Sequence, residues 1–156
     1  MLTASTSKAA GEGVDESGAR LAELAEQLGL DVVAREVLAD DRAAIADRLR
    51  VLADEGECAL VLTTGGTGFA PTDVTPEATR DVIERDAPGL AEALRLASRG
   101  RARHWMLSRG VAGIRGRTLI VNFPGNPRSI AEAADAIAGS LPHALELLAG
   151  ERSPHG

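Results

Sequence analysis

The chain contains no tyrosine, two phenylalanines and one tryptophan, so aromatic side chains are scarce. A surface that binds nucleic-acid bases by stacking is therefore not expected. The single cysteine, Cys58, excludes both an intramolecular disulfide and a metal site built from several cysteines. Because Cys58 begins an apolar stretch, its thiol is more typical of a protein core than of a reactive nucleophile.

Positive charge is also in short supply. The 17 lysine and arginine residues are outnumbered by 23 acidic residues, which gives a formal net charge of −6. This balance argues against a nucleic-acid interface, which normally needs a basic face. No apolar run approaches the roughly 20 residues that span a bilayer, and no signal peptide is recognisable. We therefore expect a cytoplasmic protein with neither a nucleic-acid nor a membrane partner.

Hydrophobic residues, in contrast, make up 44% of the 156 positions, which is enough for the core of one domain. We expect this domain to cover residues 1–150 and residues 151–156 to form a flexible tail. Apolar patterns predict strands at residues 2–5, 31–38, 58–62, 104–107, 111–114 and 117–121, and helices at 19–28, 42–54, 76–84, 90–97, 128–139 and 141–148. This alternation predicts a three-layer α/β/α sandwich with a mainly parallel sheet.

Glycine and proline refine this prediction at three places. The glycines of residues 8–13 predict a loop after the first strand, which is short. Pro88-Gly89 predicts an interruption between two helices, because proline cannot continue a helix that precedes it. Arg115-Gly116 predicts a hairpin turn, since the glycine can adopt a positive φ.

A glycine-rich segment follows the predicted strand 58–62 directly. Residues 63–68 read TTGGTG and leave bare backbone N–H groups at the carboxyl end of a strand, where open α/β sheets bind ligands. The segment matches neither common nucleotide motif: Phe69-Ala70-Pro71 stands where a Walker loop needs Gly-Lys-Ser/Thr, and Pro71 stands where the dinucleotide fingerprint needs its third glycine. A structural turn explains the glycines alone equally well.

Two helix starts at this sheet edge favour anion binding over a structural turn. After the glycines, Asp73 precedes a helix for which Thr75 is the expected N-cap and Pro76 the first helical residue. A second loop, residues 122–127 (NFPGNP), also follows a predicted strand, and Asn126 can cap the next helix. Because helix N-termini attract anions, the two loops predict a pair of phosphate sites.

Carboxylates are expected near these phosphate sites. Asp40 ends the second predicted strand and should lie at the same edge of the sheet as Asp73. The two carboxylates can hold a magnesium–nucleotide complex, because Mg²⁺ prefers oxygen ligands that it shares with phosphates. Helix capping is the alternative explanation for one member of the pair Asp40-Asp41. Arg109, after the fourth predicted strand, can grip a phosphate or be a surface cation.

Several of these segments occur together, in the same order, in one known family. Residues 63–68 (TTGGTG), 71–78 (PTDVTPEA), 88–89 (PG), 108–109 (SR) and 122–127 (NFPGNP) resemble the MogA/MoaB proteins of molybdenum cofactor biosynthesis. The resemblance implies a molybdopterin-binding fold that assembles as homotrimers or hexamers. In catalytic members, Mg-ATP adenylylates molybdopterin, and the products are adenylyl-molybdopterin and pyrophosphate. It also implies a molybdate-insertion protein as a candidate partner.

The resemblance also assigns roles to individual residues. Asp73 and Asp40 match the acidic residues that serve catalysis and magnesium binding. The residues that match the binding site for molybdopterin or its phosphate are Thr64, Gly65, Gly66, Thr67, Gly68, Ser108, Pro124, Gly125 and Asn126.

The chain departs from the family pattern at two places. Residues 5–7 read Ser-Thr-Ser, where members usually have Ser-Asp-Arg or Ser-Asn-Arg, and the C-terminal region is shorter than in many MogA proteins. The first departure is expected to weaken ligand contacts around the first loop, and the second favours the compact MoaB branch. The alternative function is therefore a non-catalytic protein that binds or carries molybdopterin.

Overall fold

In the computed structural model, which describes residues 1–55 and 58–150, a six-stranded sheet forms the centre, with the order β2-β1-β3-β6-β5-β4. The strands are β1 (Leu2–Ala4), β2 (Glu36–Leu38), β3 (Leu60–Thr64), β4 (Arg85–Asp86), β5 (Ala112–Arg115) and β6 (Thr118–Phe123). The β2, β1, β3 and β6 strands run parallel, and β5 and β4 are antiparallel to their neighbours. The mainly parallel sheet is therefore confirmed.

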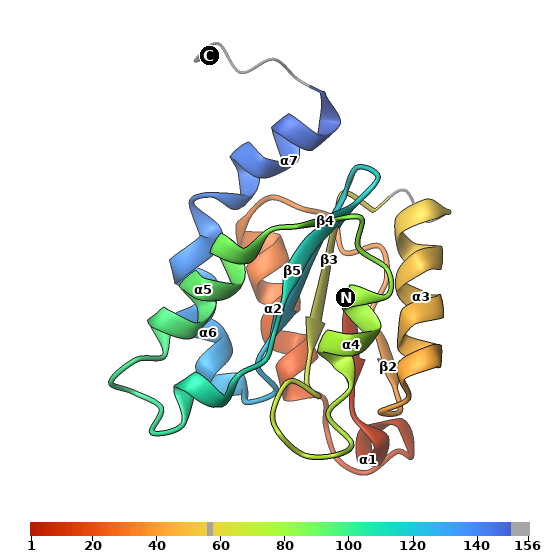
Figure 1. Cartoon of the computed structure of the whole chain (residues 1–156), viewed down its shortest axis with the longest axis vertical. Coiled ribbons are helices and arrows are strands. Elements are labelled where there is room, and N and C mark those ends of the chain that lie inside the picture. The colour runs from red at the N-terminus through yellow and green to blue at the C-terminus, as the bar shows by residue number, and fades with distance from the viewer. Residues whose placement is uncertain (56–57, 151–156) are drawn as a thin grey trace.

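Helices cover both faces of the sheet. They are α1 (Thr6–Ala9), α2 (Glu16–Gln27), α3 (Arg42–Asp54), α4 (Thr75–Arg80), α5 (Pro88–Ala97), the 3₁₀ helix η1 (Trp105–Leu107), α6 (Pro127–Ala138) and α7 (Leu141–Ala149). The α2, α5 and α6 helices pack on one face, and α3 and α4 on the other (Figure 1). The α/β/α sandwich is confirmed. Across the part of the chain that the structure describes, none of the helices has the length and apolarity needed to cross a bilayer.

The apolar sequence of β6 explains why both faces are covered. Leu119, Val121 and Phe123 belong to the core under α5 and α6, whereas Ile120 belongs to the core under α3 and α4. Successive side chains of a strand point to opposite faces, so a strand buried on both sides needs an unbroken apolar run. The sheet edge at the end of β3 and β6 is thereby held between two packed layers.

Local sequence signals account well for the helix starts. The Asp41 carboxylate accepts a hydrogen bond from Ala44 N at 2.8 Å, and α3 has the predicted bounds. Asn126 accepts from Arg128 N at 3.0 Å, with Pro127 as the first residue of α6. These N-caps satisfy backbone donors that no helical carbonyl can reach. The hairpin turn at Arg115-Gly116 is confirmed as well.

One predicted strand is wrong. Residues 104–107 do not join the sheet, and Trp105–Leu107 forms η1 instead. Its backbone bonds are local, with Leu107 N donating to His104 O at 3.0 Å. Met106 is 64% exposed, so the apolar residues that indicated a strand are not covered by the sheet. The prediction that Ser108-Arg109 follows a strand is wrong for the same reason.

Other strand bounds differ in length. Only Glu36–Leu38 of the predicted strand 31–38 is paired, because β1 offers three residues as partners, with Leu2 opposite Glu36 and Ala4 opposite Leu38. The β3 strand runs two residues later than predicted, so Thr63 and Thr64 belong to it. The two-residue β4 strand was not predicted, since it is too short to produce an apolar pattern.

Helix predictions fail where proline and threonine were misread. Pro88 begins α5 rather than interrupting a helix. Val74, not Thr75, is the N-cap of α4, which ends at Arg80 instead of residue 84. The short α1 occupies part of the predicted loop 8–13. The predicted flexible tail, 151–156, lies outside the described residues.

Candidate functional site

The two predicted phosphate loops touch each other at the carboxyl ends of β3 and β6. We call residues 65–68 the glycine loop. The Thr64 hydroxyl, just before it, donates a hydrogen bond to the Pro124 carbonyl at 2.7 Å. A Cβ added to Gly125 would lie 3.1 Å from the Gly65 Cα, so the backbones of the two loops are in contact. One ligand can therefore reach both loops.

The glycine loop needs glycine for two physical reasons. Gly65 and Gly66 have φ values of +89° and +60°, which side chains rarely adopt. Space is also absent: a Cβ on Gly65 would lie 2.3 Å from the Ala4 carbonyl oxygen, and one on Gly66 would lie 2.5 Å from the Thr75 Oγ1. These close approaches pack the loop against β1 and the start of α4.

Asp40 lies beside the glycine loop with one carboxylate oxygen engaged. Its Oδ2 accepts hydrogen bonds from the Thr6 backbone N (2.8 Å) and Thr6 Oγ1 (2.9 Å). Its Oδ1 lies 3.4 Å from the position of a Cβ on Gly66. No donor among residues 1–55 and 58–150 reaches Oδ1, which is therefore available to a ligand. Helix capping falls to Asp41, so the two adjacent aspartates have separate tasks.

Asp73 lies at the other end of the glycine loop. Its Oδ2 accepts a hydrogen bond from Ala70 N at 2.9 Å and lies 2.8 Å from the position of a Cβ on Gly68. Within the described parts of the chain, no group of three or more His, Cys, Asp and Glu side chains can hold a metal ion. Two carboxylates beside a phosphate loop nevertheless fit Mg²⁺, which is commonly held by one or two carboxylates together with substrate phosphates.

Arg109 connects the glycine loop with the Asp73 segment. Its backbone N donates to Thr67 O at 2.8 Å. Its guanidinium donates to Gly68 O (2.7 Å), to Asp73 O (2.6 Å) and to the Glu77 carboxylate. Arg109 is thus a bridge between loops, a role that neither of the two expectations, a phosphate contact or a surface cation, included. Burial is the largest single influence on the pKa of Glu77 and raises it, but the hydrogen bond from Arg109, a backbone hydrogen bond and the charges of Arg109 and Arg80 together hold this pKa below its usual range.

Replacing Arg109 with methionine should lower the free energy of unfolding by about 2–4 kcal/mol, because it leaves two carbonyls and a partly buried carboxylate without their donor. Chemical denaturation at one fixed protein concentration measures this loss. Arg109→Lys is the matched control, since it keeps the charge but not the planar fork, and it should recover a minority of the stability. An Arg109→Met protein as stable as the wild type would show that the bridge is not needed.

A cavity of about 290 Å³ adjoins the second loop. Ser108 and Pro124, both predicted site residues, line it together. Its other polar lining residues, none of them among the predicted site residues, are Arg95, Ser98, Arg103, His104, Asn122 and Ser129. His104 was expected to begin the strand 104–107, and no sequence signal connected it with the second loop.

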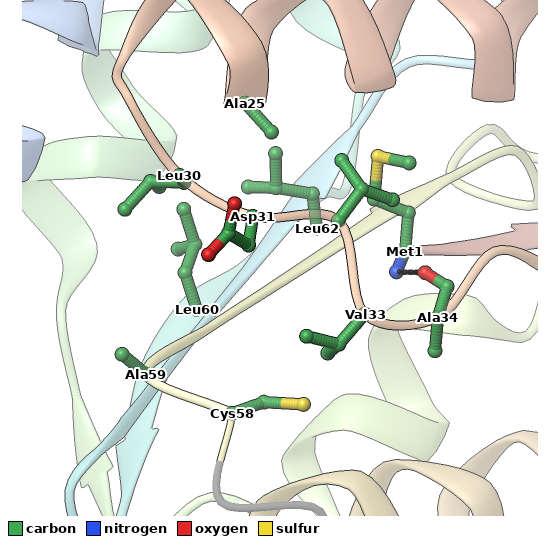
Figure 2. Close-up of a pocket in the computed structure, with 11 residues that line it drawn as sticks. Met1, Ala25, Leu30, Asp31, Val33, Ala34, Cys58, Ala59, Leu60 and Leu62 are labelled. Carbon is green, nitrogen blue, oxygen red and sulfur yellow. Dashed lines mark hydrogen bonds between the residues drawn. The ribbon is translucent and has the colours of Figure 1, made fainter.

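A separate cavity of about 250 Å³ lies at the opposite edge of the sheet, where β1 and β3 begin (Figure 2). Its lining is mostly apolar and includes Leu30, Val33 and Leu60. The Met1 amino group beside it donates to the Ala34 carbonyl at 2.6 Å. Since none of the predicted site residues lines this cavity, we give it no part in the site at the glycine loop.

Comparison with known proteins agrees with this geometry. The family model described as "Probable molybdopterin binding domain" matches residues 1–143. Molybdopterin adenylyltransferase of Helicobacter pylori J99 is 39% identical over 152 residues, which cover 96% of this chain and 86% of that protein. The molybdenum cofactor synthesis protein cinnamon of Drosophila melanogaster is 41% identical over 140 residues, 89% of this chain, but the match spans only 23% of the fly protein.

Solved structures give the same result. MoaB of Thermus thermophilus superimposes with a TM-score of 0.89 at 44% identity, covering 96% of this chain and 94% of that one. The Mog protein of Mycobacterium ulcerans also gives a TM-score of 0.89, at 40% identity, with 94% and 95% coverage. The resemblance inferred from the glycine loop and its partner segments is confirmed. The chain belongs to the molybdopterin-binding-domain family, among the MogA/MoaB proteins of molybdenum cofactor biosynthesis.

Proposed function

We propose that this protein adenylylates molybdopterin with Mg-ATP and releases pyrophosphate. One observation carries the proposal: the two loops that are suited to bind anions contact each other, and two carboxylates lie beside them. The glycine loop contacts the Gly125 backbone, and Asp40 and Asp73 lie beside Gly66 and Gly68. The similarity to molybdopterin adenylyltransferases over most of the chain supports it.

The reaction joins two phosphates and needs no nucleophile from the protein. A phosphate oxygen of molybdopterin attacks the α-phosphorus of ATP and forms a new P–O bond. The bond from the α-phosphorus to the oxygen that bridges to the β-phosphate breaks, and that oxygen leaves with pyrophosphate. Such a step depends on alignment of the reacting groups and on neutralisation of their charge.

The residues at the sheet edge are suited to these two tasks. The backbone N–H groups of the glycine loop and of the α6 N-terminus after Asn126 can bind phosphate oxygens. Asp40 and Asp73 would hold Mg²⁺, which when bound neutralises phosphate charge. Molybdopterin would use the cavity lined by Ser108 and Pro124, which adjoins the second loop.

The test is an adenylylation assay with purified protein, molybdopterin, Mg²⁺ and labelled ATP. We expect adenylyl-molybdopterin to accumulate with Mg²⁺ and to be absent when the metal is chelated. The same samples are examined for ATP binding by calorimetry. Binding of molybdopterin without binding of ATP and without product would reject the proposed enzyme.

That rejecting outcome corresponds to the second candidate function, a non-catalytic molybdopterin-binding or carrier protein. A specific observation favours it: Thr6, within the unusual segment 5–7, already donates two hydrogen bonds to Asp40 Oδ2. Half of this carboxylate is therefore engaged within the protein. Because both functions need the same molybdopterin pocket, ATP binding is the measurement that separates them.

The oligomeric state and the cellular compartment are part of the same proposal. By analogy with the family, we propose a homotrimer or hexamer located in the cytoplasm. A molybdate-insertion protein would then receive the adenylylated product.

A further inference from the structure

The hydroxyl of Thr75 is unusual in this protein. Thr75 is fully buried, yet its Oγ1 has no hydrogen-bond partner among the described residues. Its backbone is fully used, since its N–H donates to Gly66 O at 3.1 Å and its carbonyl accepts from Thr79 Oγ1 at 2.9 Å. Buried hydroxyls are normally paired, because an unpaired one loses its bonds to water and gains nothing.

Neighbouring buried threonines follow the normal rule. The Thr63 hydroxyl accepts from Asn122 Nδ2 at 2.9 Å, and the Thr64 hydroxyl donates to Pro124 O at 2.7 Å. The Thr79 hydroxyl accepts from Asn122 Nδ2 at 2.9 Å and also donates to the Thr75 carbonyl. The unpaired hydroxyl is thus a property of the Thr75 position and not of threonines in this core.

The position of this hydroxyl is informative. A Cβ on Gly66 would lie 2.5 Å from Thr75 Oγ1 and 3.4 Å from Asp40 Oδ1. The buried hydroxyl of Thr75 and the available oxygen of Asp40 therefore lie on either side of the same position, next to Gly66 in the glycine loop. Gly66, which has no side chain and a φ of +60°, lies next to both groups. Glycine reorients its peptide more readily than any other residue, so the backbone at Gly66 can move.

We propose that Thr75 is a binding residue of the nucleotide site and that its hydroxyl donates a hydrogen bond to a phosphate oxygen of Mg-ATP. The Gly66 peptide turns aside when the nucleotide binds, and Asp40 Oδ1 would help to hold the magnesium ion, which supplies positive charge to the phosphates. In the absence of the ligand the protein keeps a buried donor unpaired, which lowers its stability. This inference rests on the proposed use of ATP and adds to it a residue that was expected only to cap α4.

The substitution Thr75→Val tests the proposal, because valine has the same shape without the hydroxyl. Without ligand, the melting temperature should rise by about 2 °C or more, since a buried unpaired group has been removed. The dissociation constant for Mg-ATP, measured by calorimetry, should increase about tenfold or more. Thr75→Ser keeps the hydroxyl and should bind Mg-ATP like the wild type.

Thr79→Val is the matched control, because it removes a buried hydroxyl that is paired. It should lower the melting temperature and change the Mg-ATP affinity by less than about threefold. The proposal is overturned if Thr75→Val binds Mg-ATP as tightly as the wild type, or if it lowers the melting temperature as Thr79→Val does. If the wild type itself binds no Mg-ATP, the proposed function fails and this inference fails with it.

Discussion

The substitution Asp73→Asn should reduce adenylylation at least about 100-fold while leaving the fold intact. Asparagine keeps a side-chain oxygen that can accept the hydrogen bond from Ala70 N, now 2.9 Å from Asp73 Oδ2. It removes only the negative charge beside Gly68. Formation of adenylyl-molybdopterin from labelled ATP measures the loss, over a range of Mg²⁺ concentrations. The melting temperature of the variant reports whether the fold is kept.

Asp41→Asn is the control for this experiment. Asp41 caps α3 through Ala44 N at 2.8 Å, and asparagine caps helices as well as aspartate does. The control should therefore keep both its stability and its adenylylation rate, which excludes a general effect of lost charge. Asp73→Asn activity within a few-fold of the wild type would show that magnesium and phosphate do not depend on Asp73.

Replacing Gly65 with alanine should lower the free energy of unfolding by about 2–5 kcal/mol, through two additive effects. At φ +89° an alanine is strained by about 1–2 kcal/mol. The new Cβ would also lie 2.3 Å from the Ala4 carbonyl oxygen, so that β1 or the loop must move at a further cost of about 1–3 kcal/mol. Urea denaturation at one fixed protein concentration measures the change.

Gly116→Ala separates these two effects. Gly116 has φ +55°, and no atom of residues 1–55 and 58–150 lies within 4 Å of the position of its Cβ, its chain neighbours apart. Alanine there should cost only the strain of about 1–2 kcal/mol. We expect Gly65→Ala to be clearly the more damaging of the two. Equal losses in the two variants would mean that the contact between the glycine loop and β1 is not tight.

The loops of the site could be predicted from sequence because their requirements are local. A glycine at a positive φ, an asparagine before a proline at a helix start, and threonines after an apolar run each constrain the backbone within a few residues. Gly65, Gly66 and Asn126 therefore lie where they were expected, at the carboxyl edge of the sheet. Asp40 also lies there, although β2 ends two residues before it.

The errors arise where neighbours distant in the chain decide the outcome. Residues 104–107 have an apolar composition that suits a strand, but the sheet does not include them, and local bonds form η1 instead. The length of β1 limits how many residues of β2 can pair. The apolar pattern of residues 31–38 gives no information about the length of β1. Apolar periodicity indicates the secondary structure that a segment prefers, but not whether a neighbouring strand is available to pair with it.

The sequence by itself determined the three-layer fold, the two loops at the carboxyl ends of β3 and β6, and the family, because apolar periodicity, capping and glycine are properties of short segments. Only the tertiary structure decided the tasks of Arg109 and Thr75. The guanidinium of Arg109 donates to Gly68, Asp73 and Glu77, residues 41, 36 and 32 positions away along the chain. The Thr75 hydroxyl is left unpaired beneath Gly66 by the same packing. A hydrogen-bonding group is satisfied or left unpaired by what folding brings next to it, and a sequence motif does not contain that information.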